Sequence, residues 1–193
     1  MNNPSAFLIA SDTDHGHGPR YYGMHLIIDG YNLLHVTQSL THLDSVQLRR
    51  ERDRLIDQLS AYQKFKRSGI TLVFDGWLGG WSTEKREVKE GVEVIYSRLG
   101  EKADEVIKRL VREKGSGTVV ITSDRDISRF AERMDAAAIS SEQFQRRLET
   151  SSDRIGGGLK EEEEEEERGT KKKGFSRRPS KKEKRARAAL KKL

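Results

Sequence analysis

The sequence predicts an α/β fold in three layers, with a central, mainly parallel sheet of about five strands flanked by helices. Short apolar runs of five or six residues recur along the chain, as expected for strands that are buried on both faces. Amphipathic stretches with helical spacing separate these runs. Because strands that alternate with helices favour a parallel sheet covered by helices, this order predicts the fold class.

The predicted elements follow one another in a regular order. Short apolar runs predict strands at 24–29, 70–75, 92–96, 118–123 and 136–140. The third of these alternates more than the others, so we expect it to lie nearer an edge of the sheet. Apolar residues that recur every three or four positions predict helices at 45–67, 101–115, 125–134 and 141–150. A polar, glycine-rich loop is expected between the second and third strands.

Composition and charge divide the chain into three parts. Charged residues make up 35% of the 193 residues and hydrophobic residues 34%, which is typical of a chain of which part does not fold. The net charge of +6 resides in residues 160–193. We therefore expect a disordered N-terminal extension over 1–23, a folded domain over 24–152, and a disordered tail over 153–193. The tail begins at a glycine hinge and runs from an acidic to a basic block, with a short helix near its end as the one element its pattern allows.

The composition also excludes several classes of protein. The chain has no cysteine, which excludes disulfides and thiolate metal sites and agrees with the cytoplasmic location that we expect. No apolar run approaches the roughly 18 residues of a membrane-spanning helix, so we expect no membrane partner.

Carboxylates follow three of the predicted strands. Asp29 ends the first strand, Asp75 ends the second, and Asp124 follows the fourth, with Asp126 one step beyond. Because ligands bind beyond the carboxyl ends of the strands in open parallel sheets, these acids are expected at the edge where ligands bind. Asp104 adds a further carboxylate, because it lies on the apolar stripe of the helix predicted at 101–115.

Each of these acids has an alternative structural role. Asp124 is also a candidate helix N-cap, Asp126 would favour a helix dipole, and the two Asp-Gly pairs are also turn signals. Glu101 lies one turn before Asp104 and would share its space. Taken together, however, several carboxylates at one edge would repel each other unless a cation binds them. A hard divalent cation with oxygen ligands, Mg²⁺ or Mn²⁺, is the expected cofactor.

Four motifs carry a resemblance to a known family. They are IIDGYNLL (27–34), LVFDG (72–76), GEKADEVIKRLV (100–111) and VVITSDRDISRF (119–130). In this order, over about 24–150, they resemble the NYN-domain ribonucleases, specifically the YacP-like branch of the PIN-like nuclease superfamily. The resemblance implies a PIN/NYN-like fold with an acidic metal site. That site would carry over to Asp29, Asp104 and Asp124, with Asp75, Glu101 and Asp126 in support and Asn32 orienting groups near Asp29; which acids bind the metal directly stays open.

The resemblance implies a metal-dependent endoribonuclease that hydrolyses phosphodiester bonds of single-stranded RNA, with mRNA as the expected substrate. It also makes the ribosome a candidate partner, because some relatives are associated with translated mRNA. The preference for RNA over DNA depends on the resemblance alone. Two alternatives stay open: a non-catalytic adaptor that binds RNA or the ribosome, and a phosphatase-like phosphoryl-transfer protein. The second is disfavoured because no lysine follows the fifth predicted strand, where such schemes need one.

Two further groups of residues are candidates for binding RNA. The loop after the second strand contains both tryptophans, Trp77 and Trp81, which either stack unpaired bases or fold back onto the protein. The basic block of the tail offers an electrostatic arm for RNA phosphates. Its residues at the start of the block are Lys171, Lys172, Lys173, Arg177 and Arg178.

Overall fold

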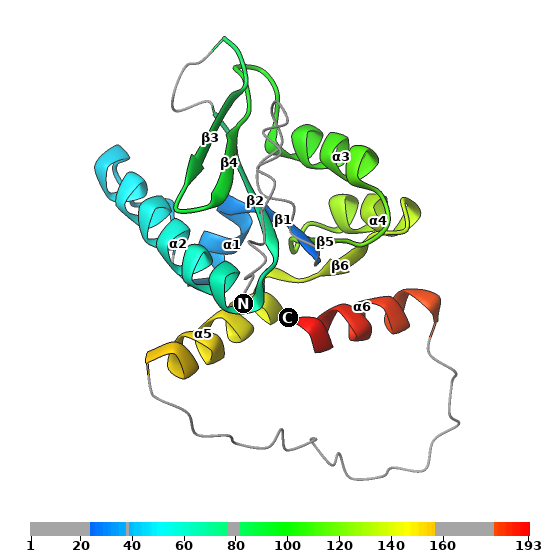
Figure 1. Ribbon diagram of the computed structural model, residues 1–193. Helices are drawn as coiled ribbons and strands as arrows, with labels where there is room; N and C mark the ends of the chain where they lie inside the picture. The colour runs from blue at the N-terminus through cyan, green and yellow to red at the C-terminus, as the bar shows by residue number, and fades with distance from the viewer. Residues whose placement is uncertain (1–23, 38, 77–81, 157–179) are drawn as a thin grey trace, which may run out of the picture.

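A computed structural model describes residues 24–37, 39–76, 82–156 and 180–193 (Figure 1). Its six-stranded sheet has the order β3-β4-β2-β1-β5-β6, and every neighbouring pair is parallel except β3 with β4. The strands are β1 (His25–Asp29), β2 (Gly69–Phe74), β3 (Lys85–Lys89), β4 (Val92–Tyr96), β5 (Thr118–Ile121) and β6 (Ala137–Ile139). The predicted α/β fold with a mainly parallel central sheet is confirmed.

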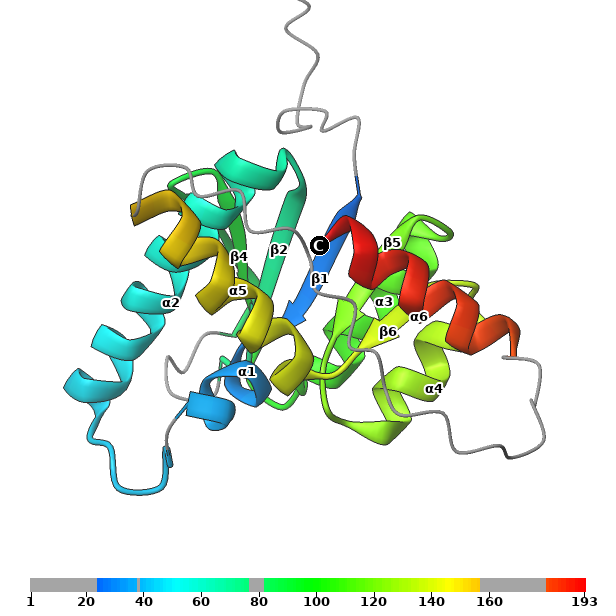
Figure 2. The ribbon, with the colours of Figure 1, turned by 90° about the horizontal axis from the view of Figure 1, so that it is seen from below.

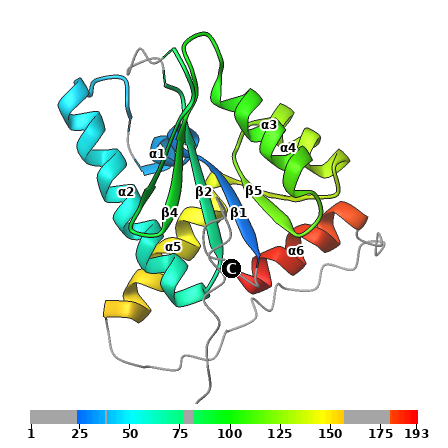
Figure 3. The ribbon, with the colours of Figure 1, turned by 45° about the horizontal axis from the view of Figure 1, so that its top comes forward.

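Helices cover both faces of the sheet. They are α1 (Gly30–Thr37), α2 (Ser45–Lys66), α3 (Ala103–Lys114), α4 (Arg125–Arg133), α5 (Ser141–Gly156) and α6 (Lys181–Lys192). Helices α1, α2 and α5 lie on one face, and α3 and α4 lie on the other (Figure 3). The side chains of the buried strands alternate between two clusters. Leu26 and Ile28 belong to the cluster under α2 and α5, whereas Ile27 belongs to the one under α3 and α4.

Two elements of the sheet region differ from the sequence predictions. The loop expected between the second and third predicted strands contains β3, an antiparallel edge strand that is mostly exposed and in which four of the five residues are charged. The Asp29-Gly30 pair does not form a turn, because Gly30 begins helix α1 directly after β1. A Cβ atom at Gly30 would come within 2.3 Å of the Phe74 ring, so only glycine fits this close passage between strand and helix.

The end of the predicted tail over 153–193 contains helix α6, where the sequence pattern allowed a short helix. Helix α6 packs along the edge strand β6, on the same side of the sheet as α5 (Figure 2). Ala189 and Leu193 are buried in the cluster under α2 and α5, and the Tyr62 hydroxyl donates to the Leu193 carbonyl at 2.9 Å. Ion pairs join Lys182 to Glu132 and Arg185 to Asp135. The expected extension over 1–23 lies outside the described residues.

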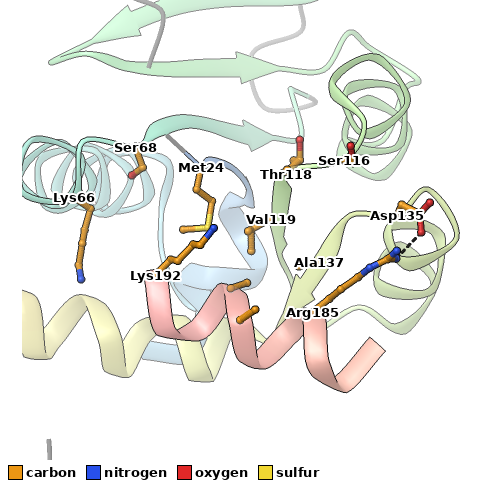
Figure 4. A pocket seen from close by; sticks show the side chains of 13 residues that line it. Met24, Lys66, Ser68, Ser116, Thr118, Val119, Asp135, Ala137, Arg185 and Lys192 are labelled. Atoms are coloured by element: carbon orange, nitrogen blue, oxygen red, sulfur yellow. Dashed lines mark hydrogen bonds and ion pairs between the residues drawn. The ribbon is translucent and has the colours of Figure 1, made fainter. Parts of the chain in front are cut away.

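A cavity of about 690 Å³ lies between α6 and the sheet (Figure 4). Met24 and Thr118 line it where β1 and β5 begin, and Arg185 and Lys192 of α6 line its other side. The cavity is therefore at the amino ends of the strands, whereas the predicted acidic site is at their carboxyl ends. Among the described residues, every helix is too short or too polar to cross a membrane.

Candidate active site

The strand order creates the position at which ligands bind in open parallel sheets. Strands β1 and β5 are neighbours in the sheet. The chain continues from β1 to β2 on one side of this pair, and from β5 to β6 on the other side. Such a reversal opens a crevice beyond the carboxyl ends of the two strands. Asp29 ends β1, and Thr122 to Asp124 follow β5. The two segments therefore face each other across this crevice.

Asp29 is the most buried carboxylate of the group, with 9% of its surface exposed. Its Oδ1 accepts a hydrogen bond from the Asn32 backbone N–H at 3.1 Å, and its Oδ2 accepts one from the Thr122 hydroxyl at 3.2 Å. The pKa of Asp29 is raised to about 6, mainly by burial and in smaller part by the negative charges of Asp104 and Asp75, while both hydrogen bonds oppose the shift. The protein thus holds a carboxylate at a place that disfavours its charge.

Asp104 lies half-buried in the first turn of α3. Burial raises its pKa first, and the charges of Asp124 and Asp75 raise it next, while Lys108 and Lys102 partly offset them. The pKa values of both Asp29 and Asp104 therefore rise through neighbouring acids as well as through burial. The structure brings four of the predicted carboxylates close enough to repel one another: Asp29, Asp75, Asp104 and Asp124.

Asp75 and Asp124 each stabilise the start of a helix. Asp75 Oδ1 accepts the Ala103 backbone N–H at 2.6 Å, at the first residue of α3. Asp124 is the N-cap of α4, and its Oδ1 accepts from the backbone N–H groups of Asp126 at 2.7 Å and Ile127 at 3.0 Å. Asp124 therefore does serve as a helix N-cap, the alternative role considered from the sequence. This role coexists with a position beside Asp104.

Two of the predicted supporting acids lie apart from this group. Glu101 is taken up by ion pairs with Arg109 at 2.7 Å and with Arg98 at 3.4 Å, and Arg109 also bridges to Glu84. Asp126 is exposed in the first turn of α4, where it faces solvent and favours the helix dipole. Neither carboxylate is among the charges that raise the pKa of Asp29 or Asp104.

Asn32 fixes the segments on the two sides of the crevice to each other. Its side-chain oxygen accepts from the Ser123 backbone N–H at 2.9 Å and from the Ser141 hydroxyl at 2.8 Å. One amide thereby joins the start of α1 to the end of β5 and to the start of α5. This position agrees with the predicted orienting role near Asp29, since the backbone N–H of Asn32 also binds that carboxylate.

Sequence reasoning missed Thr122. The residue is 1% exposed; its hydroxyl donates to Asp29 and accepts the Asp124 backbone N–H at 3.1 Å. A single hydroxyl group thus connects the two carboxylate-bearing segments. The available signal was the TSD sequence at 122–124, in which two hydroxyl residues stand between the strand and the acid.

The predicted RNA-binding residues lie outside the described part of the chain. This applies to the loop tryptophans and to the first basic residues of the tail: Trp77, Trp81, Lys171, Lys172, Lys173, Arg177 and Arg178.

The donor set agrees in chemistry with Mg²⁺ or Mn²⁺, since carboxylate oxygen is the ligand that these ions prefer. In the ranges that the structure describes, however, no group of three or more His, Asp or Glu side chains is close enough to hold a metal ion. Magnesium is commonly bound by one or two carboxylates and completed by water and substrate phosphates. The arrangement around Asp29 and Asp104 fits that mode and does not fit a site made wholly of protein ligands.

Comparison with known proteins gives the same family as the motifs. A model of the YacP-like NYN domain matches residues 26–190, which extends past the predicted domain boundary at 152 and into α6. The protein YacP of Bacillus subtilis (strain 168) is 30% identical over 133 residues, which cover 67% of this chain and 78% of YacP.

Solved structures of Rae1 (YacP) from Bacillus subtilis also match. One of them, of a mutant in which leucine replaces a tryptophan, superposes with a TM-score of 0.58 at 27% identity, covering 69% of this chain and 79% of that one. The second Rae1 structure gives a TM-score of 0.56 at 28% identity, covering 68% of this chain and 76% of the other. The chain described here therefore belongs to the YacP-like NYN domain family, which is a family of nucleases.

Proposed function

We propose that this protein is a metal-dependent endoribonuclease that hydrolyses phosphodiester bonds of single-stranded RNA, with mRNA as substrate and the ribosome as a partner. One observation carries the proposal. Asp29 is buried at the switch point of the sheet and connected through Thr122 to the Asp124 segment, and its pKa is raised first by this burial and then by the charges of Asp104 and Asp75. Burying a carboxylate near other carboxylates costs folding free energy, which an acid with a purely structural role would avoid at an exposed position. A cation site, by contrast, needs this concentration of negative charge.

Asp29 and Asp104 are the residues that would hold the divalent ion, because both are in this cluster and the pKa of each is raised by burial and by neighbouring acids. A bound Mg²⁺ or Mn²⁺ would supply a Lewis acid and lower the pKa of a coordinated water. The backbone N–H of Asn32 and the hydroxyl of Thr122 orient the Asp29 carboxylate. Asp75 and Asp124 fix the first turns of α3 and α4, so that the acids keep their positions relative to each other.

The test is cleavage of an end-labelled single-stranded RNA in Mn²⁺, with and without EDTA. We expect the wild type to cut internally only with metal and the Asp29→Asn variant to lose cutting by at least about a hundredfold, as expected when a group that organises catalysis is removed. Asp57→Asn is the matched control, because Asp57 is an exposed acid on α2.

Cutting by Asp29→Asn at the wild-type rate would contradict the proposal, and so would wild-type cutting in EDTA. A single-stranded DNA of the same sequence measures the preference for RNA directly. Binding of RNA without any cutting would instead favour the adaptor alternative.

A further inference from the structure

The acidic crevice by itself repels the RNA backbone, so a cationic group beside it is needed to hold the strand. Arg52, on the first half of α2, lies at the same edge of the sheet. Its guanidinium carbon is 5.8 Å from the ring centroid of Phe74 and 5.6 Å from that of Tyr96. These two residues are the last of β2 and β4, and their rings are stacked at 5.8 Å. Arg52 thus covers the carboxyl ends of two strands, next to Asp75.

Arg52 lacks a carboxylate partner for its charge. Across the described ranges no carboxylate forms an ion pair with it, and its Nε atom is buried without a hydrogen bond. The Tyr31 hydroxyl is buried beside it; burial raises the pKa of this hydroxyl, and its interaction with the guanidinium opposes that rise. Burial of such groups is unfavourable unless they gain a partner. Within the described residues, the guanidinium of Arg52 therefore has no carboxylate that neutralises it, and an anion bound at its edge would supply that missing charge.

Tyr31 connects this place to the acidic crevice. It is the second residue of α1, two positions after Asp29, and its ring contacts Phe74 at 5.0 Å between centroids. The charges of both Arg52 and Asp75 act on its hydroxyl. A strand of RNA that reaches the carboxylates therefore passes directly beside the guanidinium.

We propose that Arg52, assisted by the Tyr31 hydroxyl, binds a phosphate of the RNA backbone next to the phosphodiester that is cleaved. This proposal rests on the proposed function, for which it names a substrate-binding residue. A phosphate is the matching ligand because the guanidinium fork pairs with two phosphate oxygens. A base does not match, because the two rings beneath Arg52 are 0% and 5% exposed and offer no free face.

The test measures binding without cleavage. In an Asp29→Asn background, fluorescence anisotropy reports the affinity for a labelled single-stranded RNA over a range of salt concentrations. Arg52→Met keeps an apolar side chain over the rings, and we expect about tenfold weaker binding at low salt, as for loss of a charge-assisted hydrogen bond. The slope of log affinity against log salt should decrease by about 0.7, the value for one phosphate on a single strand.

Arg54→Met is the matched control. Arg54 is two positions further along the same helix, its side chain is 76% exposed, and it pairs with Glu51, so its loss should change binding by less than about twofold. Tyr31→Phe removes only the hydroxyl and should weaken binding about threefold. If Arg52→Met melts early, Arg52→Lys keeps the charge but loses the fork, and it should still bind more weakly than the wild type.

Failure of this inference is distinct from failure of the proposed function. If the Arg52 and Arg54 variants bind RNA equally well while the wild type cuts RNA in Mn²⁺, the Arg52 site is refuted and the nuclease stands. If the wild type cuts no RNA but its RNA binding depends on Arg52 as described, the Arg52 site stands and the nuclease is refuted.

Discussion

Replacing Asp29 by Asn should stabilise the metal-free fold at neutral pH while it abolishes cleavage. The pKa of this carboxyl rises from an ordinary 3.8 to about 6 on folding, chiefly because the group is buried. A raised acid pKa contributes stability that is complete below pH 3.8 and is lost as the pH rises through 6. The full loss is about 3 kcal/mol, of which about 2 kcal/mol falls between about pH 4 and pH 8.

Urea denaturation in EDTA at both pH values, followed by circular dichroism, measures this effect. We expect the difference in unfolding free energy between Asp29→Asn and the wild type to grow by about 2 kcal/mol from about pH 4 to pH 8. Groups that titrate in both proteins, such as the half-buried His25, largely cancel in this difference. An equal difference at the two pH values would refute the claim that folding raises the pKa of Asp29.

Metal binding should reverse that order of stability. Mn²⁺ in excess is expected to raise the melting temperature of the wild type at about pH 8, because the ion binds the folded state only. The Asp29→Asn variant should show less than half of the rise, since an amide is a weaker ligand than a carboxylate. Equal rises in the two proteins would show that the ion binds elsewhere, whatever the cleavage assay gives.

Three further changes test the framework of the site and the docking of helix α6. Thr122→Val removes the hydroxyl shared by two segments and should destabilise the fold by about 1–3 kcal/mol and slow cleavage, whereas Thr122→Ser should restore both; urea melts and rate assays measure this. Gly76→Ala places a Cβ 1.8 Å from the Ser97 carbonyl oxygen, so we expect a loss of at least about 2 kcal/mol in the same melts, and wild-type stability would contradict this packing. Tyr62→Phe removes the buried hydrogen bond to Leu193 and should lower stability by about 1 kcal/mol; an unchanged calorimetric melting temperature would argue against the docked α6.

The strands that position the site were predictable because their apolar runs are continuous. The run 24–29 and the structural strand β1 end at the same residue, Asp29, and this coincidence is enough to place the acid at the sheet edge. Strand β3 was not predictable in this way, since an exposed edge strand made mostly of charged residues buries little and has no apolar pattern. Helix α1 was hidden because Asp-Gly is a turn signal in isolation, and the ring of Phe74 that selects Gly30 is distant in sequence.

Within the site, spacing predicted the face of α3 that carries Asp104, but it did not predict the ion pairs of Glu101. Helical periodicity fixes which face a side chain occupies, and Asp104 lies where that periodicity puts it. Periodicity does not determine which basic residue a flexible glutamate pairs with, and Glu101 forms an ion pair with Arg109. Arg52 was equally invisible, because its environment is made by two rings from strands that only the tertiary fold brings beneath it.

The docking of α6 has a consequence for the order in which the protein folds during synthesis. Leu193 contacts Tyr62 across 131 positions of sequence, and α6 lies along β6 over the cavity that Met24 lines at the start of β1. Contacts of such long separation form late, because most of the intervening chain must be present and ordered first. On the ribosome, the amino ends of the central strands therefore stay uncovered by α6 until this helix has emerged from the exit tunnel. A nascent chain that has completed β6 thus still presents to solvent the apolar surface on which Ala189 and Leu193 later settle.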